Sequence, residues 1–326
     1  MNKWKKILIG IIAVILVLGL AKNILIKAVV QSGATFVTGA PVKIRSLAVG
    51  VFRPRIVIKD FKMYNPKGFP QGVMVDIPLI RVVYDLPGLL SGELHLSEVT
   101  LDLKEVVLYK NKEGRLNVDA LKVAETKPQP KKEEPSARES KTAPPMPIRM
   151  AEVNLNLGQV VVKDYSVEGP VEILAYPLGV KDKTYKNINS PQELMTLILV
   201  QAMGPTALKS AGLYAAATVL GIGFLPAGVA GIMLGKDSAV ETFPVSFQTA
   251  YDKTKQFLSQ QGEIVNEDPG QGRLQAKIRS NDLTLILIEK GKQEVEITVK
   301  ARKMLLPKPE AAEGLLYQLS EQFSKL

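Results

Sequence analysis

Two stretches of thirteen residues decide the fold: LSEVTLDLKEVVL at residues 96–108 and MAEVNLNLGQVVV at residues 150–162. They align without a gap at an offset of 54 residues, and six aligned positions are identical. In both stretches apolar residues alternate with polar ones, as in a β-strand with one buried face. Such a repeat indicates one supersecondary unit used twice, so we expect one sheet to continue through both stretches.

The repeat places two sets of apolar side chains on one strand face, and this face has two interpretations. It either lines a groove that holds acyl chains or belongs to an ordinary covered core. The lipid-face candidates are Val99, Leu101, Leu103, Val153, Leu155 and Leu157. If lipid lies there, a charge placed at Leu101 or Leu155 should abolish lipid retention while the fold survives.

Strand patterns also extend upstream of the repeat, whereas the chain between its two halves is of another kind. Residues 42–109 alternate in the same way, and turn formers interrupt them at residues 65–68, 87–88, 91–92 and 111–114. This spacing predicts an antiparallel meander. Residues 125–147 hold six prolines, nine charged residues and no aromatic side chain, which is typical of a flexible tether.

The N-terminus has the pattern of a membrane segment. Basic residues at positions 3, 5 and 6 precede an uncharged apolar run over residues 7–21, and apolar residues continue to residue 30. At ~1.5 Å per residue, continuation to residue 26 brings the run close to the ~30 Å of a bilayer core. We expect an uncleaved anchor with a cytoplasmic N-terminus. A signal peptide cleaved after Ala21 is the alternative, and either one sends the following chain out of the cytoplasm.

The positive charge of the chain is concentrated at this end. Residues 1–70 contain twelve basic residues and one acid, whereas residues 71–326 contain thirty basic and thirty-one acidic residues. With only 6% aromatic residues and no recognisable reading element, nucleic acid is not an expected partner. Candidates for contact with anionic lipid headgroups are Lys43, Arg45, Arg53 and Arg55, with a solvated strand face as the alternative.

Three further segments follow the repeat. A Ser-Pro-Gln-Glu start at residues 190–193 predicts a helix to residue 203. Residues 211–235 are uncharged and rich in Gly and Ala, which indicates a membrane span, a hairpin lying in the membrane or a buried helical core. In the C-terminal part we expect strands at 243–247, 273–278, 283–288 and 294–299, with helices at 248–261 and after Pro309.

The composition leaves little basis for catalysis. The chain has no cysteine and one histidine, which excludes disulfides, thiolate metal sites and sites built from several histidines. His95 lies in an alternating strand, and no Gly-x-Ser-x-Gly elbow supplies a serine nucleophile. We therefore predict no catalytic residue, no metal, no cofactor and no enzymatic activity.

Four short motifs carry a resemblance to a known family: GAPVKI at 39–44, NPKGF at 65–69, LLSGEL at 89–94 and GRLNVDAL at 114–121. With the apolar N-terminus, their order and spacing resemble the N-terminal region of the bacterial AsmA family over residues 1–122, and more loosely over 148–180. The resemblance implies an inner-membrane protein with β-rich units in the periplasm, associated with outer-membrane assembly and with phospholipid movement along an apolar groove. The C-terminal part resembles a small domain of unknown function of bacterial envelope lipoproteins.

These observations predict an α+β protein with an N-terminal transmembrane helix, antiparallel β-rich AsmA-like repeat units, an apolar Gly/Ala-rich segment and a small C-terminal α+β domain. The expected units are an anchor at 1–31, a β-rich domain at 32–124, the tether at 125–147, a second β unit with a helix at 148–205, the apolar segment at 206–236 and the C-terminal domain at 237–326.

Two functional hypotheses follow. The first is an inner-membrane-anchored, periplasm-facing protein that contributes to cell-envelope lipid homeostasis or outer-membrane assembly, with membrane phospholipid as its partner. The alternative is a non-enzymatic envelope scaffold that binds a protein partner through its C-terminal domain.

Overall fold

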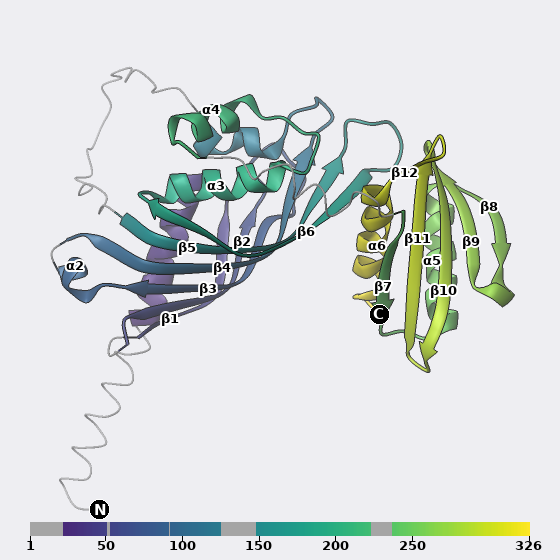
Figure 1. The fold of residues 1–326 in the computed structure, drawn as a ribbon, viewed down its shortest axis with the longest axis horizontal. Coiled ribbons are helices and arrows are strands. Elements are labelled where there is room, and N and C mark those ends of the chain that lie inside the picture. The colour runs from purple at the N-terminus through teal and green to yellow at the C-terminus, as the bar shows by residue number, and fades with distance from the viewer. Residues whose placement is uncertain (1–21, 51–52, 91, 125–147, 223–236) are drawn as a thin grey trace, which may run out of the picture.

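The computed structural model describes residues 22–50, 53–90, 92–124, 148–222 and 237–326. This part of the chain is α+β and rich in β-sheet, with two separate six-stranded sheets (Figure 1). The first sheet runs in the order β1-β2-β3-β4-β5-β6, and the second runs β12-β11-β10-β9-β8 with β7 paired to β11. Each sheet has its own hydrophobic core.

The fold-class prediction is wrong in its N-terminal transmembrane helix. No helix in the described ranges is long and apolar enough to cross a membrane. Residues 1–21, which include the apolar run and the alternative cleavage site, lie outside those ranges. Residues 22–38 are described and form a helix, but the polar side chains of this helix contact a strand of the protein, as set out below.

The first sheet joins the two expected β units into one. Its strands are β1 (Val42–Gly50), β2 (Arg55–Tyr64), β3 (Val73–Tyr84), β4 (Leu94–Lys110), β5 (Ile148–Asp164) and β6 (Glu172–Ile188). A short helix, α2 (Leu86–Leu90), connects β3 to β4, and the 3-10 turns η1 (Asn117–Ala120) and η2 (Lys122–Ala124) follow β4. The tether at 125–147 lies outside the described residues.

The two halves of the repeat lie side by side as β4 and β5, which confirms that the sheet continues through both. Their register equals the repeat offset, so Leu101 lies opposite Leu155 and every repeated residue faces its counterpart. The pair is parallel, however, whereas all other neighbours in this sheet are antiparallel. The antiparallel meander predicted for residues 42–109 is confirmed in β1–β4, whereas the expected antiparallel arrangement of the two repeat units is wrong at this pair. Parallel neighbours need a long crossover, and residues 111–147 supply it.

Polar side chains also pair between β4 and β5 and form a ladder of contacts along the two strands. Three side-chain pairs join residues 54 apart: Asp102 with Asn156 at 2.7 Å, Glu105 with Gln159 at 3.0 Å, and Lys110 with Asp164 at 3.0 Å. In the first two pairs a carboxylate of β4 accepts a hydrogen bond from an amide of β5, and in the third a lysine faces a carboxylate. The ladder fixes the register together with the apolar face.

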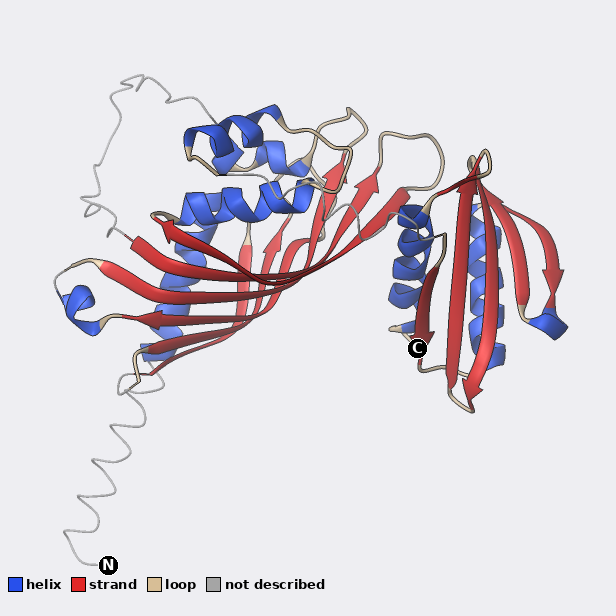
Figure 2. Ribbon diagram, viewed as in Figure 1, coloured by secondary structure: helices blue, strands red, loops and turns tan. Residues whose placement is uncertain are grey.

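Helices α3 (Pro191–Met203) and α4 (Ala211–Val219) lie beside the first sheet (Figure 2). The predicted start of α3 is confirmed, because the Ser190 side chain accepts from the Glu193 N–H at 3.1 Å. Nine residues of α3 are buried. The described part of the apolar segment ends at residue 222 and contains the nine-residue helix α4, which packs against α3 and buries Leu213 and Ala217. Residues 223–236 lie outside the described ranges.

The second sheet carries two helices that pack into its core. Its strands are β7 (Ala239–Phe243), β8 (Glu263–Asp268), β9 (Arg273–Ile278), β10 (Asn281–Gly291), β11 (Glu294–Lys303) and β12 (Leu306–Pro307). The two helices are α5 (Phe247–Gln261) and α6 (Pro309–Phe323), and the 3-10 turn η4 (Pro269–Gln271) connects β8 to β9. The strand expected at 243–247 is wrong, because Ser246 caps α5 by accepting from the Thr249 N–H. Strand β8 was not anticipated.

Helix α6 also joins the second sheet to the first. Tyr317 packs with Val107, Tyr109, Val161 and Ala175 in a small cluster on the polar side of β4–β6. At Gly314, a Cβ atom would lie 2.0 Å from the backbone oxygen of Ile173 in β6, so only glycine fits there.

A lysine from β5 sits between the aromatic rings and an acid of this contact. The Lys163 ammonium lies 5.2 Å from the centre of the Tyr317 ring and 3.6 Å from a Glu321 carboxylate oxygen. Burial raises the pKa of Tyr109 to about 12, and it raises the pKa of Tyr317 further. Both phenols therefore stay neutral at physiological pH, and the lysine faces uncharged rings.

Candidate membrane-facing surface

Helix 22–38 lies along β1, the edge strand of the first sheet, and binds it through side chains spaced four residues apart. Asn23 Oδ1 accepts from the Val49 N–H at 3.2 Å, and Lys27 Nζ donates to the Arg45 carbonyl at 3.1 Å. Gln31 Oε1 accepts from the Ile44 N–H at 3.2 Å, and Thr35 Oγ1 accepts from the Val42 N–H at 3.1 Å. A period of four keeps these side chains on one helix face, where they satisfy backbone groups that an edge strand leaves unpaired.

Replacing Gln31 by leucine should destabilise the first sheet by about 1–3 kcal/mol, because the part-buried Ile44 N–H loses its acceptor. Urea unfolding measures the loss, and hydrogen exchange at the Ile44 amide locates it. The control is Ser32→Ala on the exposed side of the same helix, which should change stability by less than about 0.5 kcal/mol. Equal effects of the two changes would contradict the edge-binding role of Gln31.

The opposite side of helix 22–38 is exposed and carries no charge. Its exposed positions are Ile24, Leu25, Ala28, Val29, Ser32, Gly33 and Phe36, and we call this set the outer face. The side chains of Ile24, Leu25, Val29 and Phe36 are 66–74% exposed. Between the outer face and the polar side, Ile26, Val30 and Ala34 pack against the core of the first sheet. Large apolar side chains gathered on one exposed helix face are typical of an interaction surface.

The basic residues predicted to contact headgroups lie in the strands beside this helix. Lys43 and Arg45 are exposed in β1, and Arg53 and Arg55 are exposed in the turn before β2 and at its first residue. Arg45 is paired with Asp60 at 3.3 Å, although its side chain remains 81% exposed. An exposed pair of this kind is weak, so its guanidinium stays accessible to other anions. The predicted basic side chains are thus exposed in β1, in the turn after it and at the start of β2, and β1 is the strand that helix 22–38 binds.

A further cation lies near the C-terminal end of the outer face and was not singled out from the sequence. Lys122, from η2, holds its ammonium 4.5 Å from the centre of the Phe36 ring. It belongs to a segment far from the helix in sequence, so only the tertiary structure reveals the contact.

The lipid-face candidates lie together, as the sequence predicted, but inside the core of the first sheet. Each of the six is at most 4% exposed, and all belong to one cluster that includes residues of α3 and α4. An acyl chain could reach them only if the covering helices moved.

Two of the four motifs that carry the AsmA resemblance meet at one buried contact. Asn117, from the GRLNVDAL motif, donates to Asn65 Oδ1 of the NPKGF motif at 2.8 Å. Asn117 also accepts from the Tyr109 N–H at 3.0 Å. These hydrogen bonds satisfy buried amides and tie the end of β4 to the connection between β2 and β3. In this chain the two asparagines therefore have a structural role.

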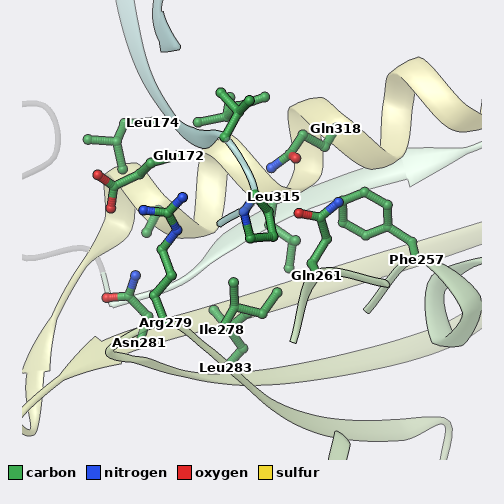
Figure 3. A pocket seen from close by; sticks show the side chains of 14 residues that line it. Glu172, Leu174, Phe257, Gln261, Ile278, Arg279, Asn281, Leu283, Leu315 and Gln318 are labelled. Carbon is green, nitrogen blue, oxygen red and sulfur yellow. The ribbon is translucent and has the colours of Figure 1, made fainter. Parts of the chain in front are cut away.

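The other candidate features are a small cavity, the single histidine and groups of metal-ligating side chains. A cavity of about 50 Å³ lies between β6 and the second sheet, with room for a few water molecules (Figure 3). Arg279 lines it, and one of its Nη atoms is buried without a hydrogen-bond partner. His95 is exposed in β4. Within the described ranges, no three His, Cys, Asp or Glu side chains are grouped so that they could hold a metal ion.

Comparisons with protein-family models, with curated proteins and with solved structures find no match for this chain.

Proposed function

We propose that the protein lies against a lipid bilayer through the outer face of helix 22–38 and acts there, without catalysis, in cell-envelope lipid homeostasis. The observation that carries the proposal is the division of this helix, whose polar side chains bind β1 while its outer face is uncharged and exposed. The proposal concerns a helix on the membrane surface and requires no membrane-spanning segment.

The surroundings of the outer face support a bilayer as its partner. Interfacial helices place apolar side chains at the level of the headgroups, with cations around them. Lys122 supplies one such cation, over the Phe36 ring, and Lys43, Arg45 and Arg55 are exposed in β1, which the helix binds, and in β2. Each basic residue near an anionic surface contributes about 1 kcal/mol, so four of them add substantially to the apolar contact.

The role in envelope lipid homeostasis rests on the resemblance of residues 1–122 to the AsmA family. Because the six lipid-face candidates are buried, the proposal concerns contact with the membrane surface and not a lipid groove. On this proposal the first sheet is a folded platform that is held at the bilayer, and phospholipid is the partner of its surface.

A single-cysteine probe tests the membrane contact, because the chain has no cysteine of its own. We expect a fluorophore attached to Val29→Cys, in the full chain on vesicles of phosphatidylcholine and phosphatidylglycerol, to be strongly quenched by nitroxide-labelled lipid. The control is Glu113→Cys, at an exposed turn after β4. Residues 7–21 are apolar in sequence and can bind vesicles by themselves. The experiment therefore measures how deep the probe at position 29 lies in the bilayer, and not the total binding of the chain to vesicles. A probe at position 29 that is quenched no more than the control would refute the proposal.

Replacing Leu25, Val29 and Phe36 together by serine tests the cellular role. We expect this variant to fail to restore the envelope barrier in cells that lack the protein, measured as sensitivity to detergent. The matched control replaces Val240, Val265 and Ile288 by serine, three apolar residues that are 45–64% exposed on the second sheet. The control should restore the barrier, and equal behaviour of the two variants would count against the outer face.

A further inference from the structure

The hairpin between β11 and β12 has an unusual turn. Arg302 lies opposite Pro307 and Lys303 opposite Leu306, so the loop consists of two residues, Met304 and Leu305. Their φ angles are +48° and +68°. Two positive φ values in a two-residue hairpin define a type I′ turn, which strongly favours Asn-Gly or Asp-Gly. Methionine and leucine are thus placed in a backbone conformation that other residues fit better.

The same turn exposes its apolar side chains to solvent. Met304 and Leu305 are each 85% exposed, and Leu306 is 66% exposed. Among all the large apolar side chains in the described ranges, Met304 and Leu305 are the most exposed. The turn therefore departs from two local rules at once, in backbone preference and in burial. Departures of this kind are expected where function, and not folding, selects the residues.

Cations flank the apolar tip on both sides. The sequence reads RKMLLPK over residues 302–308, so two basic residues precede the tip and Lys308 follows it. Arg302 and Lys303 are exposed. We call Arg302, Lys303 and Lys308 the collar. Two acids form ion pairs with it, Asp237 at 3.9 Å from Arg302 and Glu310 at 3.6 Å from Lys308, and Asp282 of β10 lies opposite Arg302. Both contacts are at the long end of ion-pair geometry, which leaves the collar available to other anions.

We propose that the β11–β12 turn inserts its tip into an anionic lipid bilayer. Met304, Leu305 and Leu306 enter the boundary between headgroups and acyl chains, while Arg302, Lys303 and Lys308 contact lipid phosphates. This goes beyond the contact proposed for helix 22–38, since it gives the C-terminal domain a membrane contact of its own.

The shape and charge of the turn favour a bilayer over a protein partner. A two-residue hairpin tip protrudes, and its flexible aliphatic side chains match the soft interface of a membrane better than a fixed pocket. In a bilayer the lipid phosphates lie above the acyl chains. When the apolar tip enters the acyl region, the cations of the collar are at the level of the phosphates.

The test places a single-cysteine fluorophore at Met304→Cys in the full chain. The control is Lys292→Cys, in the turn at the other end of β11. With vesicles of phosphatidylcholine and phosphatidylglycerol we expect a blue shift and strong lipid quenching at position 304, and neither at position 292. With phosphatidylcholine alone, or in high salt, the response at 304 should fall at least threefold.

A second variant separates the membrane role from a structural one. Replacing Met304 by asparagine and Leu305 by glycine supplies the residues that a type I′ turn favours, so the melting temperature should stay the same or rise. A probe at Leu306→Cys should nevertheless lose most of its quenching in this background. If the probe is still quenched as strongly as before, the apolar tip is not the membrane contact and the inference is wrong.

The remaining outcomes are also decisive. If the probe at 304 stays in water on vesicles but crosslinks to an envelope protein, the turn binds protein and the lipid inference is overturned. Quenching at position 29 without quenching at 304 overturns this inference and leaves the contact of helix 22–38 standing. Quenching at 304 alone supports this inference and refutes the contact of helix 22–38.

Discussion

Replacing Gly314 by alanine should separate helix α6 from the first sheet. The added Cβ would lie 2.0 Å from the Ile173 backbone oxygen and 2.8 Å from its carbonyl carbon, and neither atom can move without shifting β6. Overpacking against backbone costs about 1–3 kcal/mol, and retreat of α6 also forfeits the contacts of Tyr317 and Lys163. We expect a loss of at least about 2 kcal/mol in the free energy of unfolding.

The change in unfolding can be measured by calorimetry, in which one transition should broaden or split as the two sheets unfold separately. Hydrogen exchange should rise at the start of β6, near Ile173. Gly33→Ala is the matched control, since Gly33 is also helical and a Cβ there meets nothing within 4 Å. This control should gain roughly 0.5–1 kcal/mol, because alanine favours helix over glycine. A gain at Gly314 equal to that at Gly33 would show that α6 and β6 are not in close contact.

Replacing Leu101 by aspartate should unfold the first sheet. Leu101 is 3% exposed and lies between Ile80 of β3 and Leu155 of β5. Truncating a buried leucine costs about 3–5 kcal/mol, and burying a carboxyl group adds its desolvation. The total approaches the whole stability of an ordinary domain, about 5–15 kcal/mol.

Far-ultraviolet circular dichroism and resistance to protease report this loss of fold. The control is His95→Asp on the same strand, where the side chain is exposed and Arg149 lies opposite in β5. It should change stability by less than about 0.5 kcal/mol. The sequence-based hypothesis of a lipid groove expects a charge at Leu101 or Leu155 to spare the fold. A folded Leu101→Asp variant that has lost bound lipid would therefore favour the groove over the packed core.

Much of the first sheet could be predicted from the repeat, but its direction could not. Alternation identifies a strand and its buried face, yet it is the same for parallel and antiparallel neighbours. The parallel pairing of β4 and β5 depends on where the chain returns after residue 110, which is a property of the crossover. In the second sheet, β8 was missed because a mostly exposed edge strand, EIVNED, lacks the apolar alternation of a buried one.

The candidate surface was missed for a related reason. Residues 24–30 continue the apolar N-terminus in composition, which conceals the polar residues spaced four apart at Asn23, Lys27, Gln31 and Thr35. The spacing is visible in the sequence. The edge of β1 that these side chains bind, however, exists only in the folded sheet. The β11–β12 turn carried no Gly or Asn to mark it, so its type could not be anticipated.

The in-register pairing of β4 and β5 also bears on how such a chain can arise by duplication. Two identical copies placed at this offset would set Asp102 against a second aspartate and Glu105 against a second glutamate. Like charges directly opposite each other repel, so an exact duplicate is a poor neighbour for its parent. Asn156 and Gln159 remove that repulsion, because each keeps the shape of the acid and replaces its charge with a hydrogen-bond donor. Glu98 still lies opposite the identical Glu152, and there the Asn154 amide donates a hydrogen bond to both carboxylates, at 3.5 and 3.2 Å. The amides of β5 at positions 154, 156 and 159 thus let two similar strands pair in register, whereas a further copy without them would face unrelieved repulsion.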